Sequence, residues 1–128
     1  MSKLAAVLRG RETESYMDSI IRDRMRTDDV DCYWRSQPFS GWDHKGYDFL
    51  VVFSDIPDLA FPLQVKSSEK GKEKFCAQSS KDIPCIVCGP HIDYETVQMR
   101  FGLFARLCRF EAQTKQGVIR ALTLSQTN

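Results

Sequence analysis

The chain has 128 residues, of which 42% are hydrophobic and 27% charged, with 18 Lys and Arg against 17 Asp and Glu. This composition is typical of a globular protein, and the length suits one domain, residues 1–128. The net charge of +1 excludes a chain that binds nucleic acid through a strongly basic overall charge.

Location and redox state follow from the N-terminus and the cysteines. No apolar run approaches the ~18 residues of a membrane span, and the N-terminal apolar stretch is too short for a secretory signal. The five cysteines are an odd number, which does not favour a disulfide framework. We therefore expect a cytoplasmic protein with reduced thiols and no contact with membranes.

Hydrophobic periodicity and turn residues divide the chain into helices and strands. The expected elements are a helix at 13–26 capped by Thr13, strands at 32–37, 47–53 and 59–66, a helix beginning near Ser68, a strand at 83–89, a helix from Asp93 to about Phe110, and a strand at 117–124. This order predicts a single-domain α/β fold, with α+β as the alternative, in which helices flank a central mixed sheet.

Charged residues stand at the ends of the two most apolar strands. Asp48 opens the run at 47–53 and Lys66 closes the run at 59–66, with Gln64 two residues earlier on the same face. If the two strands form an antiparallel hairpin, the three side chains converge on one patch. Converging polar groups at the end of a sheet indicate a binding or catalytic site.

The chemistry of these groups suits a hard cation and a phosphate. The carboxylate of Asp48, the amide oxygen of Gln64 and the main-chain carbonyl of Val65 are ligands that Mg²⁺ accepts. Lys66 offers a point charge for a phosphate oxygen or a water. Metal-assisted hydrolysis of a phosphodiester follows from this set.

The pattern G-x-D at 46–48, a strand, a turn and Q-V-K at 64–66 resembles the PD-(D/E)xK nuclease superfamily. Its Q-x-K form is similar to Mrr-like restriction endonucleases, and the chain's size to small archaeal Holliday junction resolvases. The resemblance implies a restriction-endonuclease-like core of helix, three strands, helix and strand at about 13–89, with an added helix and strand at about 93–124. It also implies a catalytic glutamate on the first helix, which Glu14 matches best and Glu12 second.

The activity implied by the resemblance is Mg²⁺- or Mn²⁺-dependent hydrolysis of duplex or branched DNA, without a small-molecule cofactor. Asp48, Gln64 and Glu14 would hold the metal, and Lys66 would complete the catalytic set. A homodimer is expected, because cutting two strands takes two sites. Gln64 stands where the superfamily has its second acid, and an uncharged amide binds a cation less strongly.

Lys70 and Lys74 would share a helix face directly after the site, and together with Lys66 and loop residue His44 they are the expected nucleic-acid contacts. Asp43, also in the loop, is a weaker metal ligand than Asp48. Cys85 and Cys88 have a zinc-like spacing, but a strand would turn them to opposite faces, so we interpret them as core cysteines.

Three alternatives stay open. Asp48 and Lys66 could form a structural ion pair at the sheet edge, with Glu14 a solvated acid in the first turn of its helix. The chain could be a degenerate member of the fold that binds nucleic acid or a protein without catalysis. It could also be a small α+β interaction protein in which Q-V-K is a coincidence.

Overall fold

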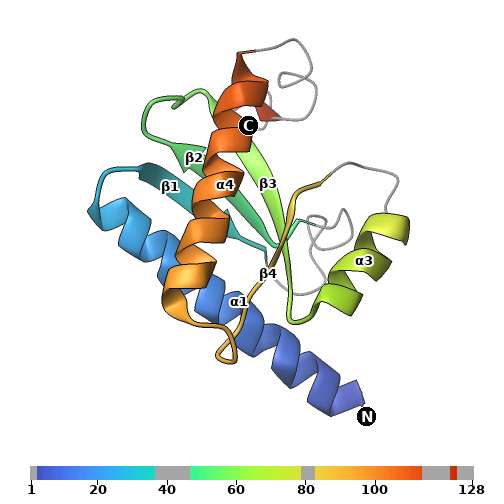
Figure 1. The fold of residues 1–128 in the computed structure, drawn as a ribbon. Helices are drawn as coiled ribbons and strands as arrows, with labels where there is room; N and C mark the ends of the chain where they lie inside the picture. The colour runs from blue at the N-terminus through green and yellow to red at the C-terminus, as the bar shows by residue number, and fades with distance from the viewer. Residues whose placement is uncertain (1–2, 37–46, 79–82, 114–121, 124–128) are drawn as a thin grey trace.

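The computed structural model describes residues 3–36, 47–78, 83–113 and 122–123, which form helices packed on a mixed sheet (Figure 1). The elements in chain order are α1 (Lys3–Arg26), β1 (Val30–Arg35), β2 (Phe49–Phe53), β3 (Leu59–Lys66), α3 (Glu69–Gln78), β4 (Cys85–Val87), α4 (Tyr94–Ala112) and β5 (Leu122–Thr123). The predicted α/β class is confirmed. No helix within the described ranges is both long and apolar enough to cross a membrane.

The sheet is mixed because the chain returns through a helix after β3. Strands β1, β2 and β3 are antiparallel neighbours, and β4 lies parallel to β3 on its other side. Phe49 lies opposite Leu63, so the expected hairpin is present and the start of β2 adjoins the end of β3. Strand β5 pairs with the beginning of β3. Pro62 lies between the residues of β3 that pair with β4 and those that pair with β5, so neither of these pairings uses the N–H that proline lacks.

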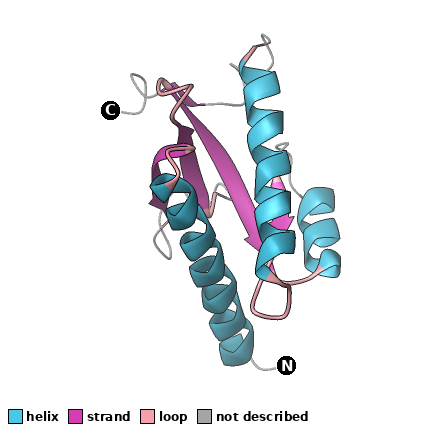
Figure 2. Cartoon of the chain, turned by 60° about the vertical axis from the view of Figure 1, so that its left-hand side comes forward, coloured by secondary structure: helices cyan, strands magenta, loops and turns pink. Residues whose placement is uncertain are grey.

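Both faces of the sheet are covered, and Figure 2 shows the helices against it. Alternate residues of β2, such as Phe49, Val51 and Phe53, join a core with α1 and α4. Leu50 and Val52 point the other way, into a smaller core beside α3. Burial on both faces explains why β2 reads as a continuous apolar run.

The predicted starts of α1 and β2 are wrong, and β1 (Val30–Arg35) and β4 (Cys85–Val87) differ from the predicted 32–37 and 83–89. Helix α1 begins at Lys3, ten residues before the predicted start, and Thr13 is therefore no N-cap. Its hydroxyl donates instead to the carbonyl oxygen of Arg9, one turn earlier, which satisfies it inside the helix. Strand β2 begins at Phe49, so Asp48 lies just before it. At the later helices, the Ser68 hydroxyl accepts from the Gly71 N–H at 3.0 Å, and the Asp93 carboxylate caps α4 by accepting from the Thr96 N–H.

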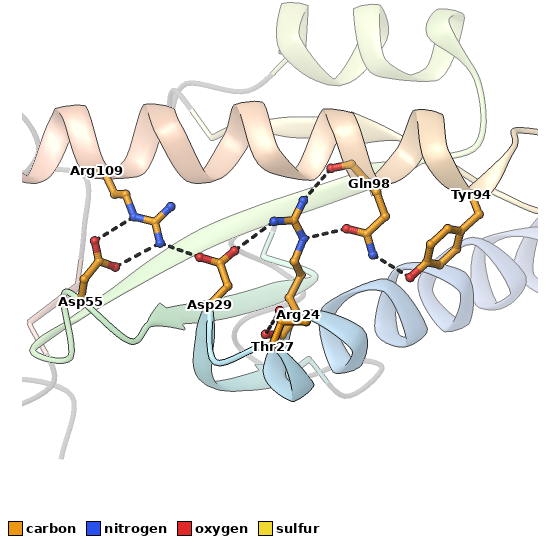
Figure 3. A network of polar contacts seen from close by, with 7 residues as sticks. All are labelled: Arg24, Thr27, Asp29, Asp55, Tyr94, Gln98 and Arg109. Atoms are coloured by element: carbon orange, nitrogen blue, oxygen red, sulfur yellow. Dashed lines mark hydrogen bonds and ion pairs between the residues drawn. The ribbon is translucent and has the colours of Figure 1, made fainter.

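A polar network fastens α4 to the rest of the molecule (Figure 3). Arg109 of α4 donates to Asp29, before β1, at 2.7 Å and to Asp55, in the turn after β2, at 2.9 Å. Arg24 of α1 reaches the other oxygen of Asp29 at 3.1 Å and also binds Gln98 of α4. The network lies at the end of the sheet where β2 ends, opposite the end that bears Asp48 and Lys66. We therefore infer that the network has a structural role.

Candidate metal and phosphate site

Asp48 is held by hydrogen bonds from two neighbouring segments. Its backbone N–H donates to the carbonyl of Leu63 at 3.0 Å, and its own carbonyl accepts from the N–H of Ser36 at 2.9 Å. The carboxylate Oδ2 accepts from the N–H of Val65 at 2.9 Å. Only 7% of the residue is exposed. The carboxylate is therefore fixed beside the peptide that follows Gln64 in β3.

Gln64 is buried at the same edge with an unsatisfied oxygen. Only 8% of Gln64 is exposed, and its backbone N–H donates to the carbonyl of Pro84 at 2.9 Å. Its side-chain Oε1 has no hydrogen-bond partner among the described residues. A buried acceptor without a partner costs about 1–3 kcal/mol. A ligand that bound this oxygen would recover that free energy.

Lys66 brings a positive charge to the same strand end. It lies two residues after Gln64, so both side chains point to the face of β3 that α3 covers. Its Nζ lies 5.4 Å from the ring centroid of Phe75 on α3, a cation–π distance. The aromatic ring thus positions the ammonium group without neutralising it.

Glu14 reaches the site from the middle of α1. The pKa of Asp48 is raised to about 7, chiefly by burial and also by the charge of Glu14 and a hydrogen bond with its side chain, while the Val65 N–H and Lys66 act to lower it. The two carboxyl groups therefore lie close together. The interpretation of Glu14 as a first-turn acid is wrong, because α1 begins eleven residues earlier, at Lys3. Glu12, the second choice, is exposed.

Glu14 and Lys66 thus both act on the pKa of Asp48, and Gln64 directly precedes the residue whose N–H binds the Asp48 carboxylate. We call these four residues the candidate site. The donor set fits a hard divalent cation, since it offers two neighbouring carboxyl groups and an amide oxygen that no described residue binds. A structural ion pair between Asp48 and Lys66 does not describe it, because the described part of the chain shows no ion-pair contact between them.

The remaining predicted contacts have separate outcomes. Lys70 and Lys74 are exposed on α3, one turn apart, and lie on the helix that begins three residues after Lys66. His44 and Asp43 lie outside the described residues.

Cys85 of β4 and Cys88, directly after the strand, face different helices, as expected. Cys88 Sγ donates to the carbonyl of Thr13 on α1 at 3.6 Å. The pKa of Cys85, in contrast, is affected by Cys76 and Lys72 of α3. Across the described residues, no group of three or more His, Cys, Asp or Glu side chains could hold a metal ion. Any metal at the candidate site would therefore depend on the amide of Gln64 as well as on the two carboxylates.

Cys85 is a residue that sequence reasoning misplaced. It was expected in the core, but it is partly exposed and lies beside Gln64 in the parallel register of β3 and β4. Burial raises the pKa of its thiol to about 12, so the thiol stays neutral next to the candidate site. Only the pairing of β4 with β3 reveals this, since nothing local in the sequence specifies which strand is the neighbour.

Comparison with known proteins returns no match. No protein-family model, no curated protein and no solved structure is similar enough to this chain to be matched. The resemblance to PD-(D/E)xK nucleases stays a prediction, and function is inferred from the site itself.

Proposed function

We propose that this protein hydrolyses phosphodiester bonds in DNA with a bound Mg²⁺ or Mn²⁺. One observation carries the proposal: the buried carboxylate of Asp48, with its raised pKa, lies close to the carboxyl group of Glu14 and against the strand of Gln64, whose buried Oε1 has no partner among the described residues. A divalent cation would relieve the repulsion between Glu14 and Asp48 and give Gln64 Oε1 a partner. Few other ligands would satisfy both shortfalls at once.

Each residue of the candidate site has a role in this proposal. Asp48 and Gln64 hold the cation directly, and Glu14 assists from α1. When bound, the cation supplies Lewis-acid stabilisation of the charge that develops on the phosphate. Lys66 donates hydrogen bonds to a phosphate oxygen and orients the attacking water, with Phe75 keeping its ammonium group in place.

The arrangement of the elements supports the same reaction. The order α1, β1, β2, β3, α3, β4, with three antiparallel strands followed by a parallel one, agrees with the core that the PD-(D/E)xK resemblance implies. In addition, the hairpin places Asp48 against the strand that bears Q-V-K. A single site cuts one strand, so we propose that two copies act together on duplex or branched DNA.

A second candidate function rests on the neutral side chain of Gln64. With two carboxylates in place of three acids, the site would hold a cation less strongly than a site with a further acid. A protein of this fold that bound no metal could still bind DNA through Lys66, Lys70 and Lys74 without cutting it. Metal binding separates the two functions.

The test is cleavage of labelled duplex and branched DNA in Mg²⁺ or Mn²⁺ by the wild type, Asp48→Asn and Lys66→Met. Asp58→Asn is the matched control, because Asp58 is an exposed acid in the turn at the opposite end of the sheet. We expect the wild type and the control to cut, and the two site variants to lose activity while keeping the wild-type circular dichroism spectrum. Each role is expected to account for at least a hundredfold of the rate.

Two outcomes would argue against this proposal. Cleavage by Asp48→Asn at the wild-type rate would show that the candidate site is not the catalytic one. A wild type that binds DNA but neither cuts it nor gains thermal stability from Mg²⁺ or Mn²⁺ would favour the non-catalytic function.

A further inference from the structure

Helix α1 extends beyond the core that it covers. Figures 1 and 2 both show its N-terminal half passing the ends of the strands. Met17, Ile20 and Ile21 of its second half are fully buried, whereas residues 9–12 are exposed. Short helical segments gain most of their stability from packing, so core burial does not explain why this part of the chain is helical.

Gly10 lies in the exposed part of α1, where the described residues give no structural reason for glycine. Glycine is among the least favourable residues in a helix interior, and Gly10 does not adopt a positive φ. A Cβ atom built on it would meet nothing within 4 Å in the described part of the chain. Neither backbone geometry nor packing within the described residues requires glycine, and the open helix surface there allows the close approach of a ligand.

The position of Gly10 relates it to the candidate site. It lies four residues before Glu14, so it continues the helix face from which Glu14 meets Asp48. Arg9 and Arg11 flank it, and both are exposed. The exposed helix surface at Gly10, between two arginines, therefore leads outward from the candidate site, where Gln64 Oε1 has no partner among the described residues.

We propose that the strip formed by Arg9, Gly10 and Arg11 seats the sugar-phosphate backbone of DNA next to the phosphate that is cut. The planar guanidinium groups suit bidentate hydrogen bonds to phosphate oxygens, and the missing side chain of Gly10 lets the backbone lie against the helix. This inference rests on the proposed function and adds a second DNA-contacting segment to the lysines of α3.

The strip is tested by fluorescence anisotropy of a labelled DNA duplex in EDTA, where no divalent ion supports hydrolysis. The variants are Arg9→Gln with Arg11→Gln, and Gly10→Leu. Arg26→Gln is the matched control, since Arg26 is an exposed arginine at the far end of the same helix. Removing two phosphate contacts lowers the slope of log affinity against log salt by about 2, while the control leaves it unchanged.

The glycine is tested without risk to folding. Leucine favours a helix and has open space at this position, so the Gly10→Leu variant keeps or raises the wild-type melting temperature. We expect it to bind the duplex roughly tenfold more weakly, because its side chain occupies the place of the DNA backbone.

The outcomes separate this inference from the proposed function. If the wild type cuts DNA while these variants bind with wild-type affinity and salt dependence, the proposed DNA contact of Arg9, Gly10 and Arg11 is wrong, and the proposed function is unaffected. If only Gly10→Leu binds normally, the DNA backbone does not lie against the helix at Gly10. If the wild type neither binds nor cuts DNA, both proposals fail.

Discussion

Replacing Asp48 by asparagine should stabilise the metal-free protein at alkaline pH. Asparagine keeps the size of the side chain and the oxygen that accepts from the Val65 N–H, but it cannot carry a charge. The wild-type carboxylate is 7% exposed and faces Glu14, so its ionisation in the folded state is unfavourable. The variant removes that cost without opening a cavity.

The sign and size follow from the pKa of Asp48, which is raised from 3.8 to about 7 on folding, chiefly by burial. A carboxyl with a higher pKa in the folded state holds its proton more tightly there, so it favours folding at low pH. That contribution is lost as the pH rises from 3.8 to about 7. At 1.36 kcal/mol per pKa unit, the wild type carries a cost of up to about 4 kcal/mol above this range.

The measurement is urea unfolding in EDTA, followed by circular dichroism, at about pH 5 and about pH 8.5. The stability of Asp48→Asn relative to the wild type should increase by about 2–3 kcal/mol between the two pH values. Asp58→Asn, at an exposed position, should show no comparable change. An Asp48→Asn difference that is the same at both pH values, or that shrinks as the pH rises, would refute this account of the buried carboxyl.

Two further changes probe the site and the network. Gln64→Glu adds a third carboxylate to the candidate site. It should lower the melting temperature of the metal-free protein at pH 8 and tighten Mn²⁺ binding measured by calorimetry. An unchanged Mn²⁺ affinity would mean that the cation binds elsewhere. Arg109→Met should lower the free energy of unfolding by about 1–3 kcal/mol, because it leaves two carboxylates without their shared partner. Arg26→Met, at a pair whose arginine side chain is 79% exposed, should change it by less than about 0.5 kcal/mol, and equal losses in the two variants would contradict a structural role for the network.

Local patterns predicted most of the fold because they report burial directly. Strand β3 has the predicted bounds, 59–66, and the predicted helix near residues 93–110 is α4. The start of α1 was placed too late because Gly10 and the charges around it interrupt the apolar pattern. Residues 9–12 of α1 are exposed, so hydrophobic periodicity does not indicate that they are helical.

The candidate site was predicted in part for the same reason. Asp48, Gln64 and Lys66 interrupt apolar runs, and such interruptions are visible in the sequence. The choice of Glu14 over Glu12 came from the resemblance to the nuclease superfamily, and the packing of α1 brings Glu14 to Asp48. The position of Cys85 beside Gln64 had no local signal, because it depends on which strand pairs with β3.

The sequence by itself determined the identity of the buried segments and the polar residues that break them, since hydrophobic periodicity depends only on neighbouring residues. Tertiary structure alone decided that a carboxylate from α1 meets one before β2, that the pKa of Asp48 rises to about 7, and that Gln64 Oε1 is buried without a partner in the described chain. These properties arise from groups far apart in the chain that share one desolvated space. Desolvation and charge repulsion depend on distances that only the packed chain defines.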